Sequence, residues 1–467
     1  MIYKNEDELF ATGMIKLVNG KIEVIDKELF REKMVDNIVD TIILSNSIRM
    51  KKICHWLVYE VTPTFGLFLS SIQSLYEAKG KDVLPSFTVP AINLRVLTYD
   101  IAKAVFRSAK KINAGAFIFE IAKSEIGYTN QRPQEYVSCV LLAGIKEGYS
   151  GSVFVQGDHY QIKAKNYLQD EENEKNQLKE LIKESIQSGF YNIDIDSSTL
   201  VDLSKPNVDE QQKLNYEVCA FFTKFIRELQ PQGIEISIGG EIGEVGGKNS
   251  TPEELRAFMR GYISSINGIK GISKISIQTG TTHGGVVLPD GSIARVNIDF
   301  ETLRNLSKIA KEEFSLAGAV QHGASTLPND AFYHFPQVGC AEIHLATQFQ
   351  NIVYDYLPLG LKEKIYTWLN KNCADERKPG QSDDQFIYTV RKKALGPFKR
   401  EIYSLPQDLK DKISSVLEEE FSFLFDKLDI KDTKDLVDRY IKPVIVDKKR
   451  EDFLGEDKDL GELEGAD

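Results

Sequence analysis

The sequence predicts an α/β protein built around one parallel (β/α)8 barrel. Three observations support this prediction. Eight short apolar runs in β rhythm follow residue 85, stretches with helical periodicity separate them, and several of the runs end on reactive side chains. In a parallel barrel the carboxyl ends of all strands meet on one rim, so side chains placed there can act together.

The expected strands and helices alternate along the chain. The helix expected over residues 251–266 has the clearest start, since Thr251 can cap it, Pro252 suits the first turn and two acids follow near the positive end of the helix dipole. The expected strands span residues 87–94, 116–121, 153–158, 192–196, 234–239, 274–278, 317–321 and 341–345. The expected helices between them span residues 99–112, 132–145, 173–188, 209–229, 251–266 and 300–314.

The chain of 467 residues is longer than such a barrel requires, since about 250 residues are typical. Apolar residues at helical spacing over 35–44 and 55–75 predict helices before the barrel, where His55 is interpreted as a packed core histidine. The expected division is a helical N-terminal extension at 1–84, the barrel at 85–357, a helical C-terminal extension at 358–447 and an acidic flexible tail at 448–467.

Composition narrows the function classes. The formal net charge of -11 argues against a nucleic-acid-binding surface, because backbone phosphates are held by clustered Lys and Arg. The five cysteines are odd in number and have no Cys-x-x-Cys spacing, which argues against a disulfide framework and a zinc ribbon. The start is acidic and polar, and no run of about 18 apolar residues occurs. We therefore expect a cytoplasmic protein without a membrane partner.

The strand ends carry the candidate catalytic residues. One apolar run stops on Asp158 and His159, and two later runs end near His283 and His322, each followed by glycine. For an isolated Asp-His pair, a helix-capping Asp and a packed His would be the simpler interpretation. Recurrence on three strands favours a shared site, because the barrel brings these ends together.

Three imidazoles with one open coordination position are a common way to hold a catalytic zinc ion. The open position can take a substrate oxygen, and the metal then acts as a Lewis acid on a carbonyl. Asp158, beside His159, is a candidate to accept a proton from a substrate hydroxyl. Orientation of a neighbouring histidine is the alternative role for this carboxylate.

Small residues after two of the histidines indicate a phosphate cradle. Gly284 and Gly285 follow His283, and the stretch from Gly323 to Ser325 follows His322. Backbone N–H groups left accessible by small side chains can bind phosphate, and Ser325 adds a hydroxyl donor. A plain turn is the alternative interpretation of each glycine pair.

Residues from about 85 to 356 resemble the class II, metal-dependent fructose-bisphosphate aldolase family and its tagatose-bisphosphate aldolase relatives. The resemblance rests on the order and spacing of short motifs along the barrel. These motifs are Ala91-Ile-Asn93, Ser124, Gly157-Asp158-His159, Ile195-Asp196-Ser-Ser198, Glu241-Ile-Gly243-Glu-Val-Gly246-Gly247, Thr282-His283-Gly284, His322-Gly323-Ala-Ser325 and Leu345-Ala346-Thr347.

The resemblance implies one zinc ion per chain on His159, His283 and His322, with another divalent metal as an alternative and an accompanying monovalent cation as a further option. It implies that Asp158 is the acid and base acting on the C4 hydroxyl of the substrate. Asp196 and Glu241 match the acidic positions near the metal. The matching phosphate- and substrate-binding positions are Asn93, Ser124, Gly284, Gly323, Ser325 and Thr347, and His344 stands at a further substrate-facing position.

Several positions depart from the family pattern. The family usually has Asn where this chain has His344, and Lys where it has Glu342. Lys248 and Asn249 replace acids of the family loop, so Lys248 is either a phosphate contact or an exposed lysine. The basic stretch 391–399 is a candidate to supply cations for the second phosphate, with a plain basic helix end as the alternative.

The resemblance implies a zinc-dependent aldolase of glycolysis and gluconeogenesis that reversibly cleaves fructose 1,6-bisphosphate to dihydroxyacetone phosphate and glyceraldehyde 3-phosphate. One alternative is an aldolase for tagatose bisphosphate or another phosphorylated ketose. A second is a non-catalytic accessory subunit, which residues 157–159 and 189–198 also resemble. No lysine makes a comparable case for Schiff-base chemistry. The resemblance further implies a homo-oligomer, with a phosphorylated ketose and no nucleic acid as partner.

Overall fold

Eight parallel strands close into a barrel in the residues that the structure, a computed structural model, describes: 1–243, 248–280, 288 and 298–455. Neighbouring strands pair in chain order, β6 also pairs with β7, and β11 returns to pair with β4, with Glu342 opposite Val89. The (β/α)8 prediction is therefore confirmed. The strands are β4 (Val89–Asn93), β5 (Ile118–Ala122), β6 (Gly151–Gln161), β7 (Asn192–Asp196), β8 (Ser237–Gly243), β9 (Lys274–Ile277), β10 (Ala319–Gln321) and β11 (Glu342–Leu345).

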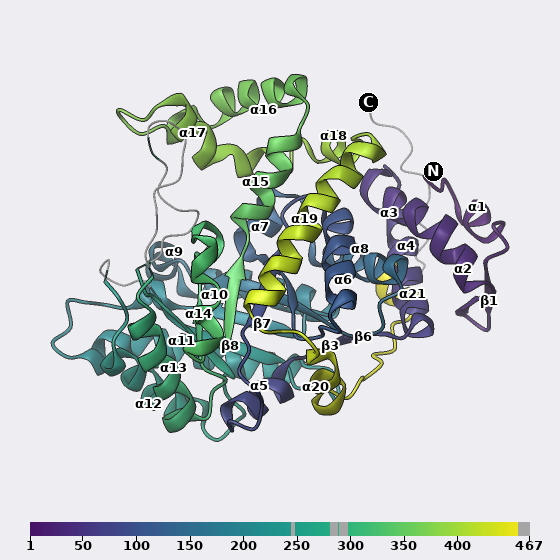
Figure 1. Cartoon of the computed structure of the whole chain (residues 1–467). Coiled ribbons are helices and arrows are strands. Elements are labelled where there is room, and N and C mark those ends of the chain that lie inside the picture. The colour runs from purple at the N-terminus through teal and green to yellow at the C-terminus, as the bar shows by residue number, and fades with distance from the viewer. Residues whose placement is uncertain (244–247, 281–287, 289–297, 456–467) are drawn as a thin grey trace.

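Helices surround the barrel, as Figure 1 shows. Each of the six predicted helices is present, and α12 begins as expected, since Thr251 caps Glu254 N–H while the Glu254 carboxylate accepts from Thr251 N–H. The helical elements of this part are α6 (Thr98–Lys111), α7 (Lys123–Tyr128), α8 (Pro133–Glu147), α9 (Ala164–Gln169), α10 (Glu171–Gln187), η3 (Ser198–Leu200), α11 (Val208–Leu229), α12 (Pro252–Ile266), α13 (Phe300–Phe314), η4 (Ala324–Thr326), η5 (Asn329–Ala331), α14 (His334–Gln337) and α15 (Thr347–Tyr356).

The N-terminal extension contains strands as well as the expected helices. β3 pairs with the first half of β6, with Leu67 opposite Gly151, because β7 begins to pair with β6 only at Gln156 and leaves that edge open. The elements are α1 (Glu6–Phe10), β1 (Ile15–Val18), β2 (Lys21–Val24), α2 (Lys27–Leu29), η1 (Phe30–Met34), α3 (Val35–Leu44), α4 (Ile48–Val61), η2 (Thr62–Phe65), β3 (Leu67–Ser70) and α5 (Gln73–Gly80).

The C-terminal extension divides into two parts. α19 packs along α6 and belongs to the helical layer of the barrel. It also packs on α15, where the rings of Phe421 and Phe349 are 4.8 Å apart. α16 and α17 stand above the barrel in Figure 1. The elements are α16 (Leu359–Asn372), η6 (Ala374–Glu376), α17 (Asp383–Val390), η7 (Arg391–Ala394), α18 (Lys399–Tyr403), α19 (Gln407–Lys427), α20 (Thr433–Tyr440) and α21 (Arg450–Leu454).

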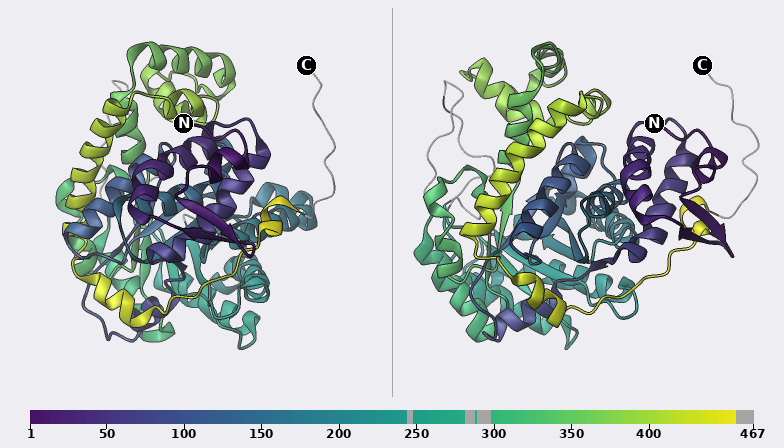
Figure 2. Two further views of the ribbon diagram at one scale, coloured as in Figure 1. Left: turned by 90° about the vertical axis from the view of Figure 1, so that its right-hand side faces the viewer. Right: turned by 45° about the vertical axis from the view of Figure 1, so that its right-hand side comes forward.

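The segment after α20 runs beneath the barrel to the N-terminal helices, as both views of Figure 2 show. There α21 packs on α4, with Phe453 buried at 5.4 Å from the Tyr59 ring and Arg450 over Trp56. The flexible tail expected from residue 448 is therefore a packed helix over 450–454, and residues 456–467 lie outside the described residues.

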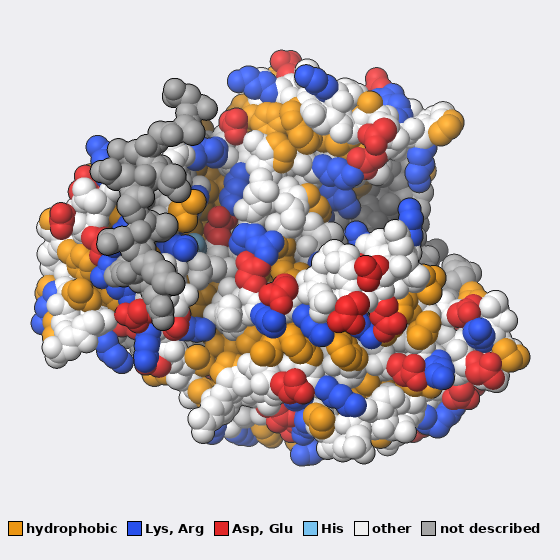
Figure 3. All heavy atoms as spheres, turned by 180° about the vertical axis from the view of Figure 1, so that it is seen from behind, with side chains coloured by type: hydrophobic (Ala, Val, Ile, Leu, Met, Phe, Trp, Pro, Cys, Tyr) orange, Lys and Arg blue, Asp and Glu red, His pale blue; other side chains and the backbone are white. Residues whose placement is uncertain are grey.

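Other expectations concern the surface and the cysteines. All five cysteines are buried and free, as their spacing predicted. On the face shown in Figure 3, basic and acidic side chains are interspersed over the described residues. Within those residues no helix combines the length and the apolar composition needed to cross a membrane.

Candidate functional site

A cavity of about 520 Å³ opens at the carboxyl ends of the strands. Its walls come from the ends of β4, β5, β6, β10 and β11 and from η7 of the C-terminal extension. Most of the residues that line it have polar side chains. The strands that carry these residues are themselves buried. Of the residues predicted from sequence, the following line it: Asn93, Ser124, Asp158, His159, His322, Gly323, Ser325, His344 and Thr347.

Asp158 and His159 are adjacent in sequence, yet both face this cavity. Successive residues of a regular strand point to opposite faces. Here the register of β6 against β7 shifts between Gly157 and Tyr160, and His159 has a left-handed backbone with φ 42°. This bulge re-aims the imidazole toward the barrel axis, as bulges beside active sites often do.

The His159 imidazole lies beside two carboxylates. Its Nδ1 lies 3.4 Å from Oδ2 of Asp196 and 3.4 Å from Oε2 of Glu241. Burial acts against the imidazolium, but the carboxylates of Asp158 and Glu241 raise the pKa of His159 well above its ordinary value. The Asp196 and Glu241 carboxylates thus lie close to a candidate metal ligand.

Candidate ligand atoms of His159, Glu241 and His322 all lie within 4.8 Å of one another. The rings of His159 and His322 are 4.3 Å apart, and Ser276 Oγ contacts Nε2 of His322 at 3.0 Å. Imidazole and carboxylate groups are the ligands that zinc takes in catalytic sites. The donor set therefore fits a divalent metal. His283 and Gly284, predicted as a third ligand and a phosphate contact, lie outside the described residues.

His344, on β11, continues this row of imidazoles, with its ring 4.0 Å from that of His322. Its Nδ1 lies 3.2 Å from Oδ1 of Asp158 and 3.0 Å from Oε2 of Glu120. On the other side, Nε2 lies 2.8 Å from Oε1 of Glu342. Burial opposes the imidazolium, but the carboxylates of Glu120 and Asp158 raise the pKa of His344 well above its ordinary value.

The same imidazole influences the candidate acid and base. Burial acts to raise the pKa of Asp158, but the neighbouring His159 and His344 hold it well below its ordinary value. An ionised Asp158 is the form that can accept a proton from a substrate hydroxyl.

Beneath His344 the barrel interior holds a buried charged cluster that the sequence analysis missed. The ammonium of Lys274 lies 2.5 Å from Oε1 of Glu342 and 2.9 Å from Oδ2 of Asp194, and it donates to Oε1 of Gln156. Burial raises the pKa of Glu120 to about 7 and that of Asp194 to about 6. The sequence did contain a signal for this cluster, namely charged residues within otherwise apolar strands. A charged side chain at a fully buried strand position needs a polar partner, so several such residues indicate that they pair with one another.

Cations gather on one wall of the cavity. The Arg95 guanidinium donates from Nε to Oε1 of Glu125 at 2.6 Å, and Asn93 donates to the other oxygen of that carboxylate. Lys392, from η7, lines the same cavity, and burial together with the nearby Arg95 lowers its pKa. In the part of the chain that the structure describes, no carboxylate lies within ion-pair distance of the Lys392 ammonium. Lys123 and Lys163 also line the cavity.

η7 is anchored so that Lys392 reaches this wall. The Arg391 guanidinium lies over the rings of Tyr354 and Tyr388, at 5.0 and 4.3 Å, and donates to Oδ1 of Asn351 at 2.5 Å. Tyr354 in turn donates to the Arg391 carbonyl. Of the basic stretch 391–399, Lys392 lines the cavity, whereas Lys393 and Lys399 pair with Glu376 and Glu135.

The remaining predicted residues have structural partners. Ser325 Oγ accepts from the backbone N–H of Ala346 and Thr347, which ties the end of β10 to the end of β11. Ser124 lies in the first turn of α7 at the cavity wall. Lys248 pairs with Glu254 at 3.1 Å and is half exposed, which agrees with the exposed-lysine interpretation.

Several solved structures are similar to this chain. The fructuronate-tagaturonate epimerase UxaE from Cohnella laeviribosi is 13% identical, with a TM-score of 0.54 over 74% of this chain and 82% of that chain. The YdjI aldolase from Escherichia coli K12 is 13% identical, with a TM-score of 0.48 over 78% of this chain and 98% of that chain. The fructose-bisphosphate aldolase from Campylobacter jejuni is 18% identical, with a TM-score of 0.48 over 79% and 97%.

Among curated proteins no relative matches the chain. A family model does match, over residues 81–401, and its description is fructose-bisphosphate aldolase class-II. The matched region contains the whole barrel, the described histidines of the cavity and η7. The chain therefore belongs to the class II fructose-bisphosphate aldolase family.

Proposed function

We propose that this protein is a zinc-dependent aldolase that reversibly cleaves fructose 1,6-bisphosphate to dihydroxyacetone phosphate and glyceraldehyde 3-phosphate. The observation that carries the proposal is the convergence of Asp158, His159 and His322 on one cavity within the family region. Arg95 and Lys392 on the cavity wall support an anionic substrate, because two neighbouring cations are stabilised by a bound phosphate.

His159, His283 and His322 would hold the zinc ion, with Glu241 and Asp196 behind His159. When bound, zinc supplies Lewis acidity toward the substrate carbonyl.

The chain's own residues account for the proton and for substrate orientation. Asp158 takes the proton of the C4 hydroxyl as the C3–C4 bond breaks, C4 becomes the aldehyde carbon, and the bonding electron pair stays on the three-carbon ketone fragment. His344 holds the Asp158 carboxylate at 3.2 Å. Gly323 and Ser325 bind one phosphate, and Lys392 with Arg95 binds the other.

A coupled cleavage assay tests the proposal. The purified chain is assayed with fructose 1,6-bisphosphate as isolated, after chelation and after zinc is restored. Activity that disappears with the chelator and returns with zinc is expected. A Schiff-base mechanism would survive chelation, and trapping with borohydride would label the chain. Absence of cleavage by the zinc-loaded chain would contradict the proposed substrate.

A second candidate keeps the reaction and changes the sugar. His344 and Glu342 occupy positions where the family usually has Asn and Lys. His344 lies against Asp158, the group proposed to act on the C4 hydroxyl, and Glu342 lies against His344. Tagatose 1,6-bisphosphate is therefore assayed in parallel. If neither sugar is cleaved, the chain is added to a separate tagatose-bisphosphate aldolase subunit, and stabilisation of that subunit would favour the accessory role.

A further inference from the structure

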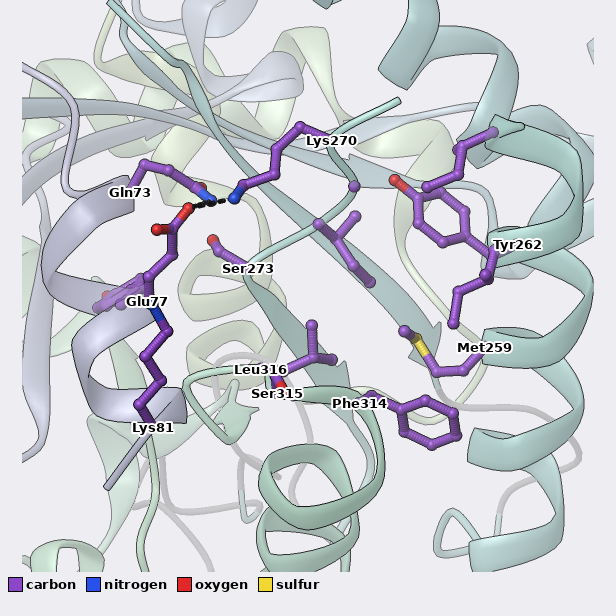
Figure 4. Close-up of a pocket in the computed structure, with 15 residues that line it drawn as sticks. Gln73, Glu77, Lys81, Met259, Tyr262, Lys270, Ser273, Phe314, Ser315 and Leu316 are labelled. Carbon is purple, nitrogen blue, oxygen red and sulfur yellow. Dashed lines mark hydrogen bonds and ion pairs between the residues drawn. The ribbon is translucent and has the colours of Figure 1, made fainter. Parts of the chain in front are cut away.

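Tyr76 reaches the barrel interior from outside the family region. It lies on α5, before residue 81 where the family match begins, and it is fully buried at the end of the barrel opposite the candidate site. This end has its own pocket of about 270 Å³, between α5 and α12, whose lining includes Tyr76 and Tyr262. Figure 4 shows this pocket, with Glu77 of α5 paired to Lys270 at 2.6 Å.

The Tyr76 hydroxyl donates to Oε2 of Glu342. The other oxygen, Oε1, is shared by the Lys274 ammonium at 2.5 Å, the Gln156 amide at 2.8 Å and Nε2 of His344 at 2.8 Å. One oxygen of this carboxylate therefore faces the site, and the opposite oxygen faces Tyr76. Glu342 is fully buried, so these groups replace solvent around it.

A continuous row of contacts thus crosses the barrel. It starts at the Tyr76 hydroxyl, passes through the Glu342 carboxylate and the His344 ring, and ends at Oδ1 of Asp158, 3.2 Å from Nδ1 of His344. The His344 ring lies between carboxylates that are within ion-pair distance of its two nitrogens, and it has His322 on one face. Its orientation therefore depends on where Oε1 of Glu342 points.

We propose that Tyr76 is a positioning residue of the active site: it fixes the Glu342 carboxylate, which fixes the His344 ring against Asp158. The inference deepens the proposed function and rests on it. The proposal assigns a role to the N-terminal extension, because α5 closes one end of the barrel and supplies the Tyr76 hydroxyl. Loss of the hydroxyl leaves Oε2 without its donor, so Lys274 and Gln156 alone hold the carboxylate and Oε1 shifts relative to His344.

The test compares two buried tyrosines that line the same pocket. Tyr76→Phe removes the hydroxyl bonded to Glu342, whereas Tyr262→Phe removes a hydroxyl that contacts Thr223 at 2.9 Å. We expect Tyr76→Phe to lower kcat about tenfold, with KM and zinc content within twofold of the unsubstituted chain. Tyr262→Phe should change kcat less than twofold. Equal losses in the two variants would overturn the proposal, because both would then reflect packing at that end of the barrel.

A double-mutant cycle separates positioning from a general structural effect. In the His344→Asn background, Tyr76→Phe should cause no further loss of kcat, because the ring through which it acts is gone. The same fractional loss in both backgrounds would overturn the proposal. Glu342→Gln gives a second route, with a loss at least as large as that of Tyr76→Phe expected if this carboxylate holds the ring.

Failure of the proposed aldolase function can be distinguished from failure of the positioning role of Tyr76. If the unsubstituted chain cleaves no ketose bisphosphate, the aldolase proposal fails while the positioning can still be tested by crystallography. A His344 ring that turns out of contact with Asp158 in Tyr76→Phe, but not in Tyr262→Phe, would support the positioning. An unchanged ring in Tyr76→Phe would overturn it.

Discussion

Nδ1 of His344 lies 3.2 Å from Oδ1 of Asp158, so β11 and β6 meet through a histidine and a carboxylate at the candidate site. Both side chains are buried, and Glu120 and Glu342 add two further carboxylates around the same ring. The Glu120 and Asp158 carboxylates consequently raise the pKa of His344 well above its ordinary value.

His344→Asn should destabilise the fold. Removal of one partner from a buried ion pair leaves uncompensated charge, and the expected loss is about 3 kcal/mol in the free energy of unfolding, measured by urea titration. Glu120→Gln added to His344→Asn should recover part of that loss, because among the described residues His344 is the one cationic group within ion-pair distance of Glu120. A double variant less stable than His344→Asn would contradict this account.

Substitutions at the metal ligands and at the acid and base should separate metal binding from turnover. His283→Ala is expected to lose both zinc and cleavage, whereas Asp158→Ala should keep zinc and lose cleavage by at least about a hundredfold. Zinc is measured by elemental analysis after dialysis, and cleavage by the coupled assay. Full activity in either variant would rule out the assigned role.

Lys392→Met tests the cation that η7 contributes. Loss of one charge-assisted phosphate contact should raise KM for the bisphosphate roughly tenfold while kcat changes little. Lys393→Met is the matched control, since the Lys393 ammonium pairs with Glu376 and does not line the cavity. Similar KM values for the two variants would show that Lys392 does not contact the substrate.

Gly157→Ala tests the bulge that turns His159. A Cβ at this position would lie 2.5 Å from the Tyr160 ring, which is fully buried and hydrogen-bonded through its hydroxyl to Ser185. We expect a loss of about 1 to 3 kcal/mol in unfolding free energy, together with reduced zinc affinity. Gly360→Ala is the control, because that glycine is helical with open space around it, and it should be neutral or slightly stabilising.

Protonation of His55 should make stability depend on pH. Its Nδ1 contacts Ser138 Oγ at 2.7 Å, and burial lowers its pKa to about 3. Below its ordinary pKa of about 6.5, the unfolded chain binds a proton that the folded chain excludes, so stability falls as pH decreases. Between pH 6.5 and 5.5 this histidine should contribute about 1 kcal/mol of the loss. His55→Gln, compared by urea unfolding at both pH values, should remove that contribution; an unchanged pH dependence would assign it to other groups.

Much of the fold follows from local sequence patterns. The strand at 192–196 and the helix at 300–314 have the same limits in the structure as predicted, because apolar periodicity and capping residues are local properties of the chain. Thr251 caps its helix as expected for the same reason, and Glu254 completes a capping box with it. The extensions were harder to predict, since β3 exists only because a distant strand, β6, leaves an edge open to it.

The sequence by itself determined the barrel, the strand ends that carry chemistry, and the identity of Asp158, His159 and His322 as residues of one rim. Tertiary structure alone decided that Glu120, Lys274 and Tyr76 belong to the same arrangement. Lys274 meets Glu342 across 68 positions of sequence, and Tyr76 meets it across 266. No local pattern encodes such pairs, because closure of the barrel determines which inward-facing side chains share its interior.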